Sequence, residues 1–168
     1  MKRLTFLLAF IAFFAVTPGF AQDKKMASPP AKAEGTIGNV KVTINYHQPS
    51  ARGRKIMGEL VPYGEVWRTG ANNSTSIEFS GPVKIEGKDV PKGKYALFTI
   101  PGENEWVIIL NKGIDWGAYK YKQEDDVLRV NVKPAKTDSF VETFKIDVAK
   151  DEVQLKWENT VAAFKVKG

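Results

Sequence analysis

Residues 52–73 are the part of this sequence best suited to binding chemistry, because cationic, amide and aromatic side chains alternate there with glycine and proline. Four glycines (53, 58, 64 and 70) and Pro62 interrupt the segment. Glycine adopts φ values that other residues avoid and proline fixes φ, so this density predicts a defined but irregular loop. Loops held on a rigid scaffold often carry binding residues. The segment therefore predicts a site, but not a reaction.

The polar candidates in this segment are two arginines and two asparagines: Arg54, Arg68, Asn72 and Asn73. A guanidinium group carries five donors in a fixed fork that matches a carboxylate, a phosphate or paired hydroxyls, and side-chain amides add donors and acceptors. A structural alternative exists for Arg68, in which it clamps the loop through a buried ion pair with a nearby acid. The acids within reach along the sequence are Glu59, Glu65 and Glu78.

Three aromatic residues in turn-like segments, Trp67, Trp116 and Tyr119, complete the predicted ligand-binding set. Aromatic rings beside amides and carboxylates hold sugar rings or peptide side chains by stacking and hydrogen bonding. For Trp67 the alternative is a plug that closes one end of the fold. We expect the 52–73 and 111–119 loops to form the site together.

A catalytic alternative uses the carboxylates of the same loop. Glu59 or Glu65 would act with His47 and Arg68 in a metal-independent hydrolase. Hydrolysis of a glycosidic bond needs two carboxylates about 5–9.5 Å apart, a distance that sequence spacing does not give. His47 lies on the polar face of its expected strand, where a plain surface histidine is the simpler interpretation. No catalytic residue is assigned from the sequence.

Composition excludes several other chemistries. The chain has no cysteine and one histidine, so it cannot build thiol nucleophiles, zinc–thiolate sites or iron–sulfur clusters. The acidic residues 124–126 and Asp115 match no calcium-loop spacing. We therefore expect no metal and no cofactor.

The N-terminus predicts export. Lys2 and Arg3 precede an apolar run over residues 4–16, and Gly19-Phe-Ala21 has the form of a cleavage site. Residues 1–21 are thus interpreted as a signal peptide cleaved near Ala21, and residues 22–35 as a flexible leader. The apolar run is shorter than the ~20 residues of a membrane span. A periplasmic or secreted protein without a membrane span after cleavage is expected.

The charge of the chain is modestly basic. The formal charge is +6, and it falls to +4 once Lys2 and Arg3 leave with the signal peptide. Lysines are scattered along the expected strands rather than clustered, and export separates the protein from nucleic acid. We therefore expect no nucleic-acid partner.

Apolar and polar residues alternate through most of the remaining chain, which is typical of half-buried strands. Trp106 and Trp157 fall at inward positions, and residues 106–110 are apolar on both faces, as in a central strand. About nine short strands with tight turns predict an all-β fold. The expected architecture is an antiparallel two-sheet β-sandwich, immunoglobulin-like or jelly-roll-like, in one domain over residues 36–168.

Several runs of the sequence form a recognisable set, and the most distinctive is Val66-Trp-Arg-Thr-Gly-Ala-Asn72. The others are Tyr46 with Pro49, residues 53–56, 60–64, 75–80 and 91–101, Trp106, Asn111 and residues 116–117. With these residues the chain resembles the family called domain of unknown function 2911, over roughly residues 36–135. The resemblance implies a β-rich, exported bacterial protein and carries no established activity. Members often have Ser-Arg where this chain has His47-Gln48, which argues against a general catalytic role for His47.

Three functional hypotheses follow. The first is an exported, non-catalytic domain that recognises an anionic or hydroxyl-rich small molecule or a glycan through the two loops. The second is the hydrolase described above. The third is an envelope interaction module, in which the 52–73 loop is structural and an exposed sheet edge binds a protein partner of unknown identity.

Overall fold

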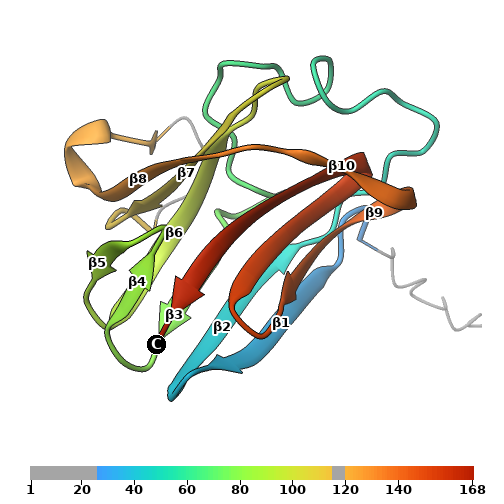
Figure 1. The fold of residues 1–168 in the computed structure, drawn as a ribbon. Coiled ribbons are helices and arrows are strands. Elements are labelled where there is room, and N and C mark those ends of the chain that lie inside the picture. Colours follow the sequence, from blue (N-terminus) through green and yellow to red (C-terminus); the bar gives the residue numbers. More distant parts are fainter. Residues whose placement is uncertain (1–25, 115–119) are drawn as a thin grey trace, which may run out of the picture.

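The computed structural model describes residues 26–114 and 120–168, which form two antiparallel sheets (Figure 1). The larger sheet has the strand order β1-β2-β3-β6-β7-β8, and the smaller has the order β5-β4-β10-β9. Their bounds are β1 Pro30–Ile37, β2 Val40–His47, β3 Ser76–Phe79, β4 Val83–Ile85, β5 Lys88–Val90, β6 Gly93–Ile100, β7 Trp106–Asn111, β8 Asp126–Val132, β9 Ala135–Val148 and β10 Glu152–Lys167. A short 3-10 turn, Gln123–Asp125, precedes β8. The expected all-β sandwich is confirmed, with ten strands rather than about nine.

The core lies between the sheets and follows the period of two in the sequence. Successive side chains of a strand point to opposite faces, so every second residue of β2 is buried, as in β10 on either side of its bulge. Trp106 and Trp157 are each 2% exposed, which confirms their assignment to the core. Strand β7 lies between β6 and β8, as expected of a central strand. Its residues are apolar on both faces because Trp106, Ile108 and Leu110 pack into this core and Ile109 is buried on the opposite side of the sheet.

The outer face of the larger sheet carries a second, smaller apolar cluster. Ala96, Phe98 and Ile109 are buried there, separate from the main core. The ring of Tyr121 packs edge-to-face on Phe98, with 5.3 Å between the ring centroids. The chain that follows β7 therefore covers part of this outer face.

The sandwich begins earlier than the sequence predicted. Residues 30–35, expected to belong to the flexible leader, pair with β2 as part of β1. The strand was missed because its inward positions carry the small residues Ala31, Ala33 and Gly35. Small residues are required there, since a Cβ on Gly35 would lie 2.6 Å from Cγ1 of Val148 in β9. Weak hydrophobicity at this edge reflects the close approach of the two sheets.

The long connection from β2 to β3, residues 48–75, closes one end of the sandwich (Figure 1). Near its start it runs along the edge of β9. The Ala51 N–H donates to the Glu142 carbonyl at 2.8 Å. The Phe144 N–H donates to the Pro49 carbonyl at 2.9 Å. Strand β9 pairs with β10 on one side only, and this part of the loop covers its other edge.

The middle and end of the loop are also fixed. The carboxylate of Glu158, which lies in a bulge of β10 at φ 51°, accepts the Met57 N–H at 3.1 Å. Further along, Trp67 and Thr99 of β6 exchange two backbone hydrogen bonds of 2.7 and 2.9 Å. Because both sheets hold the loop, its irregular backbone has a defined path.

Candidate functional site

Trp67 is partly buried and packs its ring against the main core. Its ring stacks on Trp157 at a centroid distance of 5.9 Å and meets Phe144 edge-on at 5.1 Å. A third ring, that of Trp106, lies at 6.4 Å. The indole N–H donates to the Gly70 carbonyl at 3.1 Å. The faces of the ring are therefore occupied, and we assign Trp67 to the plug that the sequence offered as its alternative role.

The turn over residues 68–74 is built by buried hydroxyls. Thr69 is fully buried at φ 54°, and its hydroxyl donates to the Thr99 hydroxyl at 3.2 Å. The Thr75 hydroxyl donates to the Thr69 carbonyl at 2.6 Å. A β-branched residue at positive φ is strained, so it persists only where its surroundings fix it. These bonds close the turn on itself and hold it against β6.

Arg68 holds the same turn from outside. Its guanidinium donates to the Asn72 carbonyl at 3.1 Å. Among the described residues Arg68 has no ion pair, so the buried clamp through Glu59, Glu65 or Glu78 is absent. Arg68 thus stabilises the backbone of its own loop.

Arg54 and Asn72 also bond to backbone. Arg54 donates from Nε to the Ala51 carbonyl at 3.0 Å and from Nη2 to the Ser50 carbonyl at 2.8 Å. The Asn72 amide donates to the Ser28 carbonyl at 3.2 Å, and so ties down the chain just before β1. Both residues organise backbone around the site.

Asn73 is the predicted site residue that lines a cavity. The cavity measures about 320 Å³ and lies on the outer side of β2 and β3, between the 68–74 turn and the chain after β7. Its lining residues are Pro30, Ala31, Asn45, Tyr46, His47, Asn73, Ser74, Ser76 and Ile114. The two loops predicted from the sequence therefore meet here, through Asn73 on one side and Ile114 on the other. Trp116 and Tyr119 lie outside the described residues.

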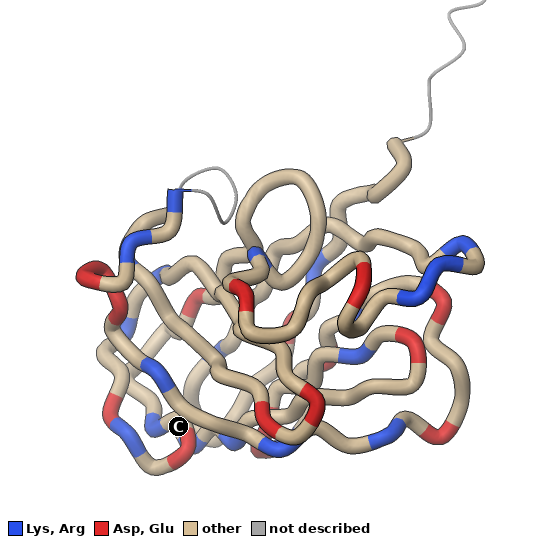
Figure 2. Tube along the Cα trace, turned by 90° about the horizontal axis from the view of Figure 1, so that it is seen from above, with Lys and Arg blue, Asp and Glu red and all other residues tan. Residues whose placement is uncertain are grey.

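The lining of this cavity combines apolar surface with neutral polar side chains. Asn45 and His47 of β2, Ser76 of β3 and Asn73 of the turn supply polar groups. Among the described residues, no Lys, Arg, Asp or Glu lines the cavity. Viewed from above, basic and acidic residues alternate around the molecule rather than gathering on one side (Figure 2). The described side chains of this cavity can therefore offer hydrogen bonds rather than ion pairs to a bound group.

The sequence reasoning missed Asn45, which has a simple signal. It lies on the same polar face of β2 as His47, two residues away, so both side chains point outward. From the sequence, a functional role at this end of β2 was considered for His47 but not for Asn45.

A polar network fixes the base of the chain that covers the outer face. The Asp126 side chain is 8% exposed and accepts from the Asn111 amide at 2.8 Å and from the Tyr121 hydroxyl at 2.7 Å. Arg129 approaches the same carboxylate at 3.3 Å. Asn111 also donates to the Lys122 carbonyl at 2.9 Å. This network was not predicted, because its members are separated along the sequence and only the fold joins them.

Tyr121 is expected to ionise late in an alkaline titration. Burial, and then the hydrogen bond and charge of Asp126, raise the pKa of Tyr121 to about 12. An unfolded tyrosine ionises near ~10, so the neutral phenol stabilises the fold below that pH. The contribution is lost as the pH rises from ~10 towards 12. Tyrosinate absorbance checks this, because Tyr121→Phe should remove the latest step. Loss of only an early step would contradict it.

The described residues contain no group of three or more His, Cys, Asp or Glu side chains placed to hold a metal ion. No helix in this part of the chain is long and apolar enough to cross a membrane.

Comparison with known families bears on the whole sandwich. Residues 28–166 match the family described as "Protein of unknown function (DUF2911)". The match contains all ten strands apart from the last residue of β10, Lys167. The chain belongs to this family. The resemblance seen in the sequence is thereby confirmed, and it extends beyond residues 36–135 to the whole domain. No curated protein and no solved structure matches the chain. Membership of the DUF2911 family thus supports the domain boundaries and assigns no function, so any function must be argued from the site.

Proposed function

We propose that this DUF2911 domain is an exported, non-catalytic binding domain that recognises a hydroxyl-rich, uncharged ligand such as a sugar. The observation that carries the proposal is the cavity of about 320 Å³ in which neutral polar side chains from β2, β3 and the 68–74 turn converge. Small-molecule sites usually start at about 300 Å³, so this cavity suits a single sugar ring.

The side chains in the cavity suit hydroxyl groups. Each sugar hydroxyl is both a donor and an acceptor, and an asparagine amide offers two donors and an acceptor that pair with neighbouring hydroxyls. Asn45 and Asn73 are both exposed at the cavity and approach it from different elements. The sequence-based expectation of an anionic ligand is less favoured here, because Arg54 and Arg68 spend donors on backbone carbonyls.

The two other hypotheses have less support. Glu59 is exposed and pairs with Lys55 at 3.4 Å, and neither it nor Glu65 lines the cavity, so no paired carboxylates face His47 there. For the interaction module, residues 49–51 cover part of the β9 edge. Further along that edge, the Ile146 N–H donates to the Tyr46 hydroxyl at 3.1 Å and is therefore not available to an added strand. Both contacts oppose strand addition at β9.

Calorimetric titration with neutral mono- and oligosaccharides tests the proposal. We expect at least one to bind, and Asn73→Ala to weaken binding about tenfold, as loss of one or two hydrogen bonds predicts. Asn104→Ala, an exposed asparagine of the turn after β6, is the matched control and should leave affinity unchanged. Uronic acids are titrated in parallel as anionic sugars. If they bind more tightly than the neutral sugars, the anionic alternative is favoured. Equal affinities for wild type and Asn73→Ala would sink the proposed site.

A further inference from the structure

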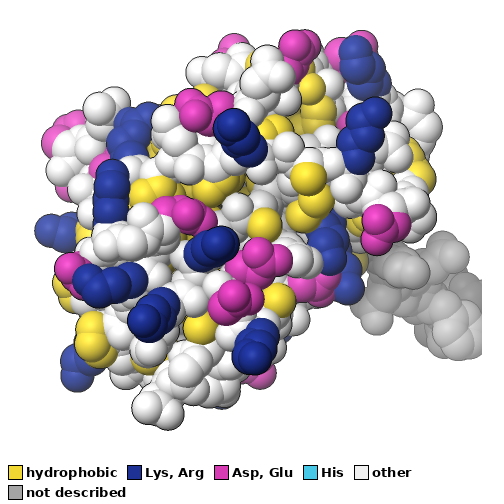
Figure 3. Space-filling view, in the orientation of Figure 1, with side chains coloured by type: hydrophobic (Ala, Val, Ile, Leu, Met, Phe, Trp, Pro, Cys, Tyr) yellow, Lys and Arg dark blue, Asp and Glu magenta, His cyan; other side chains and the backbone are white. Residues whose placement is uncertain are grey.

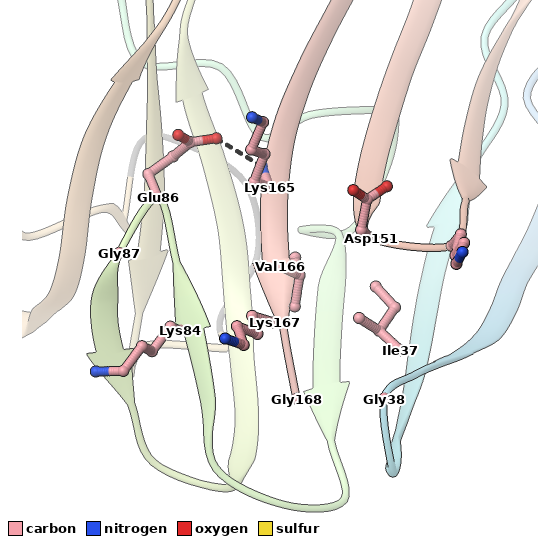
Figure 4. Close-up of a pocket in the computed structure, with 11 residues that line it drawn as sticks. Ile37, Gly38, Lys84, Glu86, Gly87, Asp151, Lys165, Val166, Lys167 and Gly168 are labelled. Atoms are coloured by element: carbon pink, nitrogen blue, oxygen red, sulfur yellow. Dashed lines mark hydrogen bonds between the residues drawn. The ribbon is translucent and has the colours of Figure 1, made fainter.

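A second cavity lies at the end of the sandwich where β1 turns into β2 and β9 turns into β10, and it shares no lining residue with the first. Its volume is about 500 Å³. Figure 4 shows the end of β10 between the β4–β5 hairpin on one side and Ile37 and Asp151 on the other. The side chains that line it include four lysines: Lys84, Lys150, Lys165 and Lys167.

Two of these lysines are neighbours across paired strands. Lys167 of β10 is the register partner of Lys84 in β4. Like charges placed opposite each other across antiparallel strands are destabilising. Lys84 is compensated, because Asp89, its partner on β5, lies 2.5 Å from its ammonium group. Within the described part of the chain Lys167 has no such carboxylate, so an uncompensated positive charge remains beside a neutralised one.

The backbone around this pair is firmly held. The Lys165 N–H donates to the Glu86 carboxylate at 2.5 Å, and the Glu86 N–H donates back to the Lys165 carbonyl at 3.1 Å (dashed line in Figure 4 for the first). Val166 is 2% exposed and points inward, so Lys165 and Lys167 point outward on the same face of β10. Glu86 is thus engaged, and Asp151 is the other acid in the lining.

The lysines also border a neighbouring cavity. A space of about 270 Å³ is lined by Pro82, Val83, Lys84, Asp89, Lys167 and Gly168. The two cavities adjoin, because they share Lys84, Lys167 and Gly168, and together they are here called the lysine groove. On the face shown in Figure 3, several basic side chains (Lys or Arg) lie at the lower left, where Figure 1 places β4, β5 and the end of β10.

We propose that the lysine groove binds a multivalent oxyanion of the phosphate type, either free or presented as a lipid headgroup. An ammonium group is a compact point charge that binds phosphate without the planar match that arginine gives to carboxylates. An anion beside the Lys167 ammonium group supplies the negative charge that Lys84 already receives from Asp89. The long aliphatic stems of the lysines line the groove and leave the charged heads at its rim.

Calorimetric titration of the full chain with tripolyphosphate at low ionic strength tests this proposal. We expect binding that weakens as salt is added, since exposed charges are screened. Lys167→Gln should weaken binding by about threefold, the effect expected for one exposed charge pair. Asp89→Asn frees Lys84 and should tighten binding by a similar factor. Lys136→Gln, which removes the same charge from the far part of β9, is the matched control.

A second arm identifies the source of the phosphate. Sedimentation with phosphatidylglycerol vesicles, compared with phosphatidylcholine vesicles, tests the lipid headgroup with the same variants. Binding of either probe, with opposite effects of Lys167→Gln and Asp89→Asn, supports the lysine groove. Failure of both probes to bind, or an equal loss in Lys136→Gln, overturns it. Neither outcome affects the saccharide proposal, because the two sites have separate linings.

Discussion

Replacing Trp67 with alanine is expected to lower the free energy of unfolding by about 3–5 kcal/mol, the usual range for deleting a large aromatic side chain from a core. The ring closes one end of the core, where it contacts Trp157, Phe144 and Trp106. Truncation would leave a cavity bounded by these three rings. It would also leave the Gly70 carbonyl without its indole donor, which loosens the turn that carries Asn73.

Urea unfolding followed by fluorescence measures this loss, and thermal unfolding should show a midpoint lower by about 6–20 °C. Trp67→Phe separates the two contributions, because it keeps most of the packing and removes only the indole N–H. Tyr63→Ala removes an exposed aromatic side chain of the same loop and should change stability by less than about 1 kcal/mol. If Trp67→Ala kept wild-type stability and instead abolished ligand binding, Trp67 would be a stacking residue, as the sequence first suggested.

The strands were predictable wherever inward positions carry large apolar residues. Strands β2, β7 and β10 have such residues; alternation located β2 and β10, and the continuous apolar run located β7. Strand β1 was missed because its inward residues are small, and small residues give no hydrophobic signal. What selects them is the distance to Val148 in β9, more than a hundred residues away along the chain. Periodicity detects burial, but it does not detect how closely two sheets approach.

The Val66–Asn72 run shows why the site was harder to predict than the fold. Tryptophan, arginine and asparagine between glycines are typical of a ligand loop, yet the same residue types also fix an irregular backbone. Here Trp67 packs against the core and Arg68 bonds to the Asn72 carbonyl. The sequence could not separate these roles, because the difference is the direction in which each side chain points. Asn73 follows the fixed turn and lines the cavity.

Replacing Gly70 with alanine is expected to destabilise the protein by about 2–3 kcal/mol and to abolish binding in the polar cavity. Gly70 has φ 155°, a conformation that residues with a side chain rarely adopt. A Cβ at this position would lie 3.0 Å from Oγ1 of Thr75 and 3.1 Å from the carbonyl oxygen of His47. The Thr75 hydroxyl is already committed to the Thr69 carbonyl, and the His47 carbonyl belongs to β2, so neither yields easily.

Gly53→Ala provides the matched control for this change. Gly53 also has positive φ, 71°, but a Cβ there meets no atom within 4 Å. It should therefore lose only about 1 kcal/mol, the conformational penalty alone. Urea midpoints give the two stabilities, and saccharide titration at a temperature where both variants stay folded gives the affinities. A larger effect on both stability and binding in Gly70→Ala would show that close packing of the turn against β2 sets the position of Asn73. Equal effects in the two variants would mean that backbone strain alone matters, and that the turn and β2 move independently.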